Sequence, residues 1–138
     1  MRLIVLDTNV VVSAGIKPGS VPHRLLHSYV LEESVKIVVC PSVMAEYREV
    51  CTRTKFAQFG FPPEWLEIML ESGLKLTEPP SWPHDLPDND DKCFLALAKA
   101  SGAWLITGNI KHFPPELRDG VTVYTPNEYL NWLENSSS

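Results

Sequence analysis

The chain has 138 residues, 44% of them hydrophobic, which is enough for one domain with its own core. A formal charge of −5, from 12 basic and 17 acidic side chains, argues against a broad basic surface for nucleic acid. Three scattered cysteines without a CxxC pair argue against disulfides and structural zinc, and no apolar run approaches the ~20 residues of a membrane span, so we expect a cytoplasmic protein.

The chain opens with Leu3 to Leu6, a short apolar run with β-branched residues, which is typical of a strand buried on both faces of a parallel sheet. Similar runs predict strands at 35–40, 103–107 and 121–124, and a shorter one at 74–77. An apolar segment of unassigned type covers 10–16. Capping residues, prolines and apolar stripes predict helices at about 20–31, 41–52, 62–72, 88–101 and 126–133.

Buried strands that alternate with helices predict βαβ crossovers. The expected fold is therefore α/β, with a central parallel sheet and helices on both of its faces. We expect a single domain over 1–134 and a frayed tail over 135–138. Sites in such sheets gather beyond the carboxyl ends of the strands, so polar residues at those ends are the first candidates.

Two acidic candidates come from separate elements. Asp7 directly follows the first strand, where it is equally consistent with a helix cap and with a ligand. Glu46 lies on the shoulder of an apolar helical stripe formed by Val43, Tyr47 and Val50. Taken alone, Glu46 is better explained as a solvated surface residue.

The run Asp88-Asn89-Asp90-Asp91 opens the most apolar helix of the chain. Acidic residues at a helix N-terminus complement its dipole, and Asp88 is the expected cap. Asp91 precedes Phe94 by three residues and therefore points toward the sheet, and Asp90 lies within the same arc. Because a buried carboxylate without a partner is costly, we expect Asp91 to meet a cation.

Thr107-Gly108-Asn109 closes a strand in the same way that Asp7-Thr8-Asn9 closes the first one. Asn109 either turns the chain or offers a neutral oxygen to a metal or its bound water. Carboxylates converge on one sheet edge with no nearby cysteine or paired histidine, which favours Mg²⁺ or Mn²⁺. Such ions activate a water and neutralise the charge of a phosphodiester.

Four segments in register resemble the PIN-domain family over nearly the whole chain, especially its prokaryotic members classed as toxins of toxin–antitoxin pairs. These segments are Leu6-Asp7-Thr8-Asn9-Val10, 42–47 (SVMAEY), 88–98 (DNDDKCFLALA) and 105–109 (LITGN). The resemblance implies a three-layer α/β/α sandwich and a metal-dependent ribonuclease of single-stranded RNA, often dimeric and held inactive by an antitoxin. It also implies products with a 5′-phosphate and a 3′-hydroxyl.

Carried over by position, the resemblance makes Asp7, Glu46 and Asp91 the catalytic, metal-binding acids, with Asp88, Asp90 and Asn109 as further metal candidates. It makes Thr8, Asn9 and Thr107 supporting groups that orient the acids or a water. Asn109 stands at the fourth acidic position of many members, which leaves one metal or two open. Nearby cations are expected to offset the repulsion between the acids and RNA, although ordinary surface charge explains any one of them. They are Arg48, Arg53, Lys55, Lys92 and Lys111, with His112 beside Lys111.

Two other classes remain as alternatives. A strand that ends in aspartate also occurs in phosphatases that form an aspartyl-phosphate, but these need a second Asp two residues on, where this chain has Asn9. The other is a non-catalytic, degenerate PIN module that only binds RNA or protein, for which Asn109 is the best support.

Overall fold

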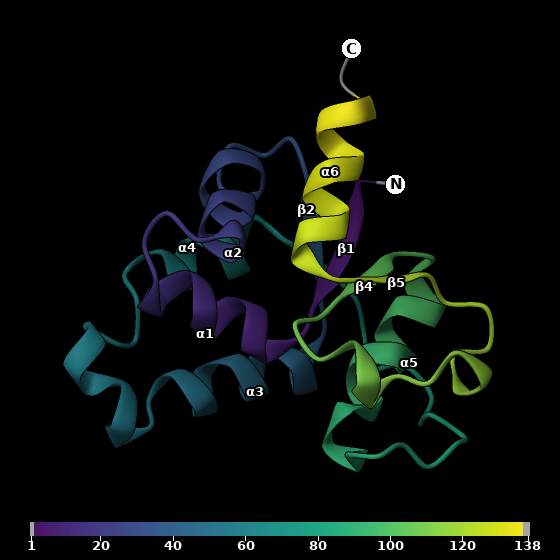
Figure 1. The fold of residues 1–138 in the computed structure, drawn as a ribbon. Coiled ribbons are helices and arrows are strands. Elements are labelled where there is room, and N and C mark those ends of the chain that lie inside the picture. Colours follow the sequence, from purple (N-terminus) through teal and green to yellow (C-terminus); the bar gives the residue numbers. More distant parts are fainter. Residues whose placement is uncertain (1, 137–138) are drawn as a thin grey trace.

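Five parallel strands form the central sheet, in the order β3-β2-β1-β4-β5 (Figure 1). The computed structural model describes residues 2–136. The strands are β1 (Leu3–Leu6), β2 (Lys36–Val39), β3 (Leu74–Lys75), β4 (Trp104–Ile106) and β5 (Val123–Tyr124). Because every neighbouring pair is parallel, the carboxyl ends of all five strands lie along one edge of the sheet.

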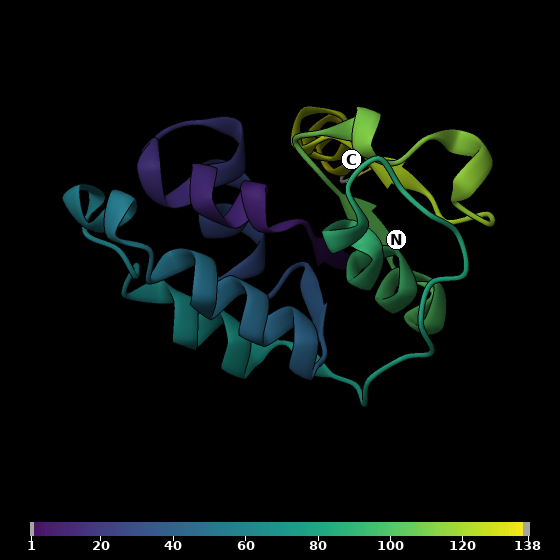
Figure 2. The same ribbon diagram turned by 90° about the horizontal axis from the view of Figure 1, so that it is seen from below.

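Helices cover both faces of the sheet and complete the predicted three-layer α/β/α sandwich (Figures 1 and 2). The α-helices are α1 (Thr8–Ile16), α2 (Val21–Leu25), α3 (Pro41–Cys51), α4 (Trp65–Ser72), α5 (Lys92–Ser101) and α6 (Pro126–Ser136). The π-helical and 3₁₀ turns are η1 (Leu26–Val30), η2 (Thr54–Phe59), η3 (Asn89–Asp91), η4 (Ile110–His112) and η5 (Pro115–Leu117). Within residues 2–136, no helix combines the length and the apolar character needed to cross a membrane.

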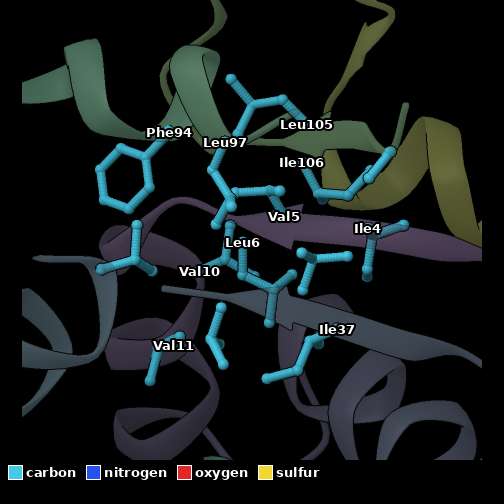
Figure 3. Close-up of a cluster of buried hydrophobic side chains, with 14 of the residues drawn as sticks. Ile4, Val5, Leu6, Val10, Val11, Ile37, Phe94, Leu97, Leu105 and Ile106 are labelled. Atoms are coloured by element: carbon cyan, nitrogen blue, oxygen red, sulfur yellow. The ribbon is translucent and has the colours of Figure 1, made fainter. Parts of the chain in front are cut away.

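The core lies around the central strand β1, which has sheet neighbours on both sides. The side chains of Ile4, Val5 and Leu6 are fully buried, as expected for a strand with helices on both faces. Helix α5 packs against β1, β2 and β4, and Figure 3 shows Phe94 and Leu97 of this helix among the apolar side chains of the sheet. This packing fixes the start of α5, where the acidic run lies, beside the end of β1.

Local signals set the helix ends. The Ser20 hydroxyl accepts a hydrogen bond from the His23 backbone N–H at the start of α2, which is the capping contact expected of a serine there. Gly102 ends α5 with a φ of 74°, a left-handed conformation that glycine adopts without the strain of a Cβ.

The structure refines three sequence expectations. The apolar segment 10–16 belongs to α1, which starts directly after Asp7. Each strand after the first is shorter than its apolar run, by one to two residues at an end. Helix α6 continues through Ser136, so Asn135 and Ser136 of the predicted tail are helical. Residues 137–138 lie outside the described part of the chain.

Candidate functional site

The ends of the two central strands bring the first part of the site together. The backbone N–H of Asp7, directly after β1, donates to the carbonyl of Ile106, the last residue of β4 (2.9 Å). Thr107, directly after β4, therefore lies beside Asp7, although the two residues are far apart in sequence. This is the edge that the parallel sheet predicts for a site.

Two side chains hold the carboxylate of Asp7. The Thr107 hydroxyl donates to Asp7 Oδ2 at 2.8 Å, and the Asn9 amide donates to the same oxygen at 3.1 Å. Asp7 is only 4% exposed, and burial raises the pKa of its carboxyl, an effect that the hydrogen bond from Thr107 partly opposes. The backbone N–H groups of Asn9 and Thr8 also lower the pKa of this carboxyl. Asp7 is thus a desolvated carboxylate that neutral donors hold in place.

Asp91, the last residue of η3, is the second buried acid, with 8% of its surface exposed. Its Oδ2 lies 2.9 Å from Nδ1 of His112, which comes from η4. Burial raises the pKa of Asp91 to about 6, and the negative charge of Asp7 raises it further, while the hydrogen bond with His112 opposes both. The inward direction expected for Asp91 is the one that the structure shows.

Asp88 and Asp90 differ in their roles. Asp88 caps η3, since its Oδ1 accepts from the backbone N–H of Asp90 at 3.0 Å, as the sequence predicted. Asp90 is exposed, so the prediction that it shares the inward arc of Asp91 is wrong, because a 3₁₀ turn precedes α5 and changes the direction of this residue. Asp88, Asp91 and His112 each place one ligand atom within 4.8 Å of the others.

Glu46 lies on α3 at the margin of the same edge. Burial raises the pKa of its carboxyl, and the nearby charges of Glu49, Asp90 and Asp7 add to this rise while Arg53 opposes it. Among the described residues, the histidine and acidic side chains that meet within 4.8 Å do not include Glu46 or Asp7. The negative charge of Asp7 therefore acts on both Glu46 and Asp91. The closest group of possible metal ligands lies around Asp91.

Tyr47, adjacent to Glu46, ties α3 to the end of β1. Its buried hydroxyl donates to the carbonyl of Leu6 at 2.5 Å, one residue before Asp7. Burial raises the pKa of the Tyr47 phenol far above its ordinary value, so it stays protonated and donates. The apolar stripe predicted Tyr47 as a core residue, and the periodicity of the sequence gave no sign of this second role.

The remaining candidates, Asn9, Thr8 and Asn109, differ in their hydrogen bonds. Asn9 is fixed at both ends, because its Oδ1 also accepts the backbone N–H of Gly108 at 3.0 Å. Thr8 is buried, yet its Oγ1 has no hydrogen-bond partner in residues 2–136, so its hydroxyl does not orient Asp7. Asn109 is exposed, and its backbone N–H donates to Oγ1 of Thr107 at 2.9 Å. Asn109 thus helps to fix Thr107 through its main chain.

Most of the predicted RNA-contacting cations are engaged at the surface. Exposed ion pairs join Arg48 to Glu67, Arg53 to Glu49, and Lys92 to Asp85. Lys55 lies over the ring of Phe56 at 5.1 Å from its centroid. The side chain of Lys111 has no polar partner in the described part of the chain. Exposed pairs contribute little to stability, so these cations can exchange partners when a phosphate approaches.

A cavity of ≈ 170 Å³ adjoins the end of the two central strands and is lined in part by Asn9, Ser13, Gly108 and Asn109. A larger hollow of ≈ 400 Å³ lies beside Trp82, on the outer side of α5, and none of the acids around Asp7 and Asp91 lines it. The buried carboxylates, and not the largest hollow, therefore mark the candidate site.

The geometry defines an α/β protein whose buried carboxylates gather beyond the carboxyl ends of its central strands. The sequence identifies the family: residues 3–111 match the PIN domain, and the chain belongs to the PIN domain family, whose members are generally nucleases. An uncharacterised protein of Methanocaldococcus jannaschii is 28% identical over 130 residues, which cover 92% of this chain and 78% of that protein.

Solved structures share the fold. The crystal structure of VapBC2 from Rickettsia felis, bound to a DNA fragment from its promoter, aligns with a TM-score of 0.62 at 19% identity, over 89% of this chain and 98% of that chain. FitAcB from Neisseria gonorrhoeae aligns with a TM-score of 0.56 at 22% identity, over 89% and 97% of the two chains. The resemblance to the PIN-domain family seen in the sequence is thus confirmed by the family match, and these solved structures confirm the fold.

Proposed function

We propose that this protein is a metal-dependent endoribonuclease that cleaves single-stranded RNA and serves as the toxin of a toxin–antitoxin pair. One observation carries the proposal: Asp7 and Asp91 are two nearly buried carboxylates at the carboxyl edge of the sheet, and the negative charge of Asp7 acts on Asp91 and raises its pKa. Desolvated like charges are costly unless a cation neutralises them. The partners that we propose are RNA as substrate, an antitoxin protein, and a second copy of the chain.

The donor chemistry fits a hard divalent ion. Asp7, Glu46 and Asp91 are the residues that would hold it, and their carboxylate oxygens suit Mg²⁺ or Mn²⁺. When bound, the ion supplies an activated water and neutralises the charge that develops on the phosphodiester. Oδ1 of Asp7, which the side chains of Thr107 and Asn9 do not contact, and the oxygen of Asp91 that His112 does not contact would supply acceptors for it.

The residues around the acids fix their geometry. Thr107 and Asn9 both donate to Oδ2 of Asp7 and so prevent this carboxylate from rotating. Tyr47 anchors the helix that carries Glu46 to the strand that carries Asp7. Arg53, whose charge lowers the pKa of Glu46, is the cation placed to meet an RNA phosphate beside the acids.

The position of Asn9 argues against an aspartyl-phosphate phosphatase. That chemistry needs an acid two residues after the nucleophile to donate and accept a proton. Here both ends of the Asn9 amide are occupied, by Asp7 and by the backbone of Gly108. Asn9 therefore has a structural role and carries no proton for transfer.

The decisive experiment compares Asp7→Asn with the wild-type protein on labelled single-stranded RNA, in the presence of Mn²⁺ or Mg²⁺ and again with excess chelator. We expect Asp7→Asn and the chelator to abolish cleavage while the circular dichroism spectrum stays unchanged, since the substitution is nearly isosteric. Asp119→Asn is the matched control, because it removes an exposed carboxylate outside the acidic edge.

Full cleavage by Asp7→Asn, or cleavage that survives the chelator, would refute the proposed mechanism. The non-catalytic alternative rests on Asn109, an amide where many PIN domains have an acid. It gives a different result, because a binding module would retain RNA or partner protein without cleaving RNA under any metal condition.

A further inference from the structure

His112 is a part of the acidic edge that the carboxylate chemistry described above does not use. It ends the short turn η4, where its backbone N–H donates to the carbonyl of Asn109 at 2.9 Å. Its side chain is partly buried and turns toward Asp91, with Nδ1 2.9 Å from Oδ2. The turn after β4 thus places an imidazole beside the carboxylate of Asp91.

The spacing of these side chains matches the coordination shell of one ion. Ligand atoms bound at roughly 2.0–2.2 Å lie about 3 Å apart when adjacent and no more than about 4.4 Å apart when opposite. Nδ1 of His112 and Oδ2 of Asp91 already have the separation of adjacent ligands. Ligand atoms of Asp88, Asp91 and His112 all lie within 4.8 Å of one another. Small rotamer changes would therefore bring all three within bonding distance of one ion.

The charges around this group indicate that it binds a cation and is not a simple ion pair. Asp7 and Asp91 are both nearly buried, and the negative charges of Asp7 and Asp88 both act on Asp91. A single imidazole faces these three carboxylates. Desolvated like charges are costly, whereas a shared divalent ion neutralises them.

The other histidine–aspartate pair of the chain shows the contrast. His84 Nε2 lies 2.9 Å from both oxygens of Asp119, so this carboxylate has no free oxygen. The two side chains are 37% and 41% exposed, and no third acid joins them among the described residues. His84 and Asp119 form a surface ion pair, which makes them a built-in control for His112 and Asp91.

We propose that His112 is a nitrogen ligand of the divalent ion at this site, beside Asp91 and Asp88, and that the site consequently prefers a transition-metal ion such as Mn²⁺ to Mg²⁺. The inference rests on the metal dependence of the proposed function. A neutral imidazole keeps a single proton, so binding through Nδ1 moves that proton to Nε2 by way of solvent. Imidazole nitrogen favours transition metals, whereas Mg²⁺ prefers oxygen ligands alone.

The test is electron spin-echo spectroscopy of Mn²⁺ bound to the intact protein, which detects the ¹⁴N nucleus of a coordinated imidazole without any reaction. We expect a ¹⁴N signal in the wild type and in His84→Asn, and none in His112→Asn. Titration of free Mn²⁺ should give a dissociation constant at least roughly tenfold higher for His112→Asn, since loss of groups that merely orient a ligand costs 10–100-fold.

A second variant tests whether the nitrogen atom of His112 itself, and not only a ligating side chain at this position, gives the signal. His112→Asp keeps a ligating side chain but replaces nitrogen by oxygen, so it should bind Mn²⁺ without a ¹⁴N signal. Competition by Mg²⁺ should then displace Mn²⁺ more readily than from the wild type. Circular dichroism confirms that each variant is folded before it is compared.

The outcomes distinguish this inference from the proposed nuclease. A ¹⁴N signal that persists in His112→Asn, or that is missing in Mn²⁺-loaded wild type, overturns the role of His112 even if RNA is cleaved. A wild type that binds Mn²⁺ through nitrogen but cleaves no RNA supports the ligand and refutes the nuclease. Failure to bind Mn²⁺ at all overturns both.

Discussion

Removal of the charge of Asp91 should stabilise the metal-free protein above pH 6. The folded pKa of Asp91 is raised from 3.8 to about 6, chiefly by burial and then by the charge of Asp7. The folded state therefore holds this proton more tightly than the unfolded state does, and stability falls as the pH rises from about 4 to about 6. At 1.36 kcal/mol for each pKa unit, the full cost above pH 6 is at most about 3 kcal/mol.

Asp91→Asn avoids this cost and preserves the local contact. The amide oxygen of asparagine can still accept a hydrogen bond from Nδ1 of His112, so the substitution removes a charge but not a partner. We expect a gain of about 1–3 kcal/mol at pH 8, or several degrees in the melting temperature of a domain of this size. At pH 4 the gain should vanish, because the wild-type carboxyl is then protonated as well.

Urea unfolding with a chelator present, at pH 8 and at pH 4, measures the effect. Asp119→Asn makes the same change in net charge at an exposed carboxylate and should show no comparable gain at pH 8. An equal effect of Asp91→Asn at both pH values, or a loss of stability at pH 8, would refute the view that Asp91 is a destabilising buried charge. Saturating Mn²⁺ should reverse the order, because an ion at 1,000 times its dissociation constant adds about 4.1 kcal/mol to a protein that binds it.

Two further predictions concern α3. Tyr47→Phe removes the buried donor to the carbonyl of Leu6, and denaturant unfolding should show a loss of about 1–3 kcal/mol from the unsatisfied acceptor; an unchanged midpoint would show that this hydrogen bond is dispensable. Glu46→Gln should lower the rate of RNA cleavage at fixed Mn²⁺ by roughly 10–100-fold, while Glu71→Gln, at an exposed glutamate of α4, should leave it unchanged. Equal rates for both glutamine variants would remove Glu46 from the site.

Much of the fold could be predicted because buried parallel strands have a distinct sequence signal. Leu3 to Leu6 is a strand over those same four residues, since an apolar β-branched run bounded by a polar residue admits few other structures. The segment 10–16 was harder to assign. Helix α1 has Val10, Val11 and Val12 in its first turns, and such β-branched residues favour strands in isolation, but packing of this helix against α2 and α3 overrides that preference.

Whether a site residue could be predicted depends on whether it lies in a regular helix, in a turn or at a helix cap. Helical spacing correctly directed Asp91 inward, because it relates this residue to the buried Phe94 of α5. The same spacing failed for Asp90, which is one residue further from α5 and is exposed within the 3₁₀ turn, whereas Asp91 directly adjoins the helix. Asp88 was predictable as a cap, since capping depends only on a residue and its near neighbours.

The sequence places Lys111-His112 beside the last of the candidate positions, but the contact of His112 with Asp91 was beyond such reasoning, because Asp91 is 21 residues earlier and the contact depends on how the chain folds back after β4. Sequence periodicity describes directions within an element, whereas this contact joins two turns at the ends of different elements. The Asn109 main chain donates a hydrogen bond to Thr107, and the turn η4 follows directly. Together these two features place His112 beside Asp91. The acids alone predicted an oxygen-lined edge, and the turn after β4 brings the imidazole of His112 to it, on which the proposed metal preference rests.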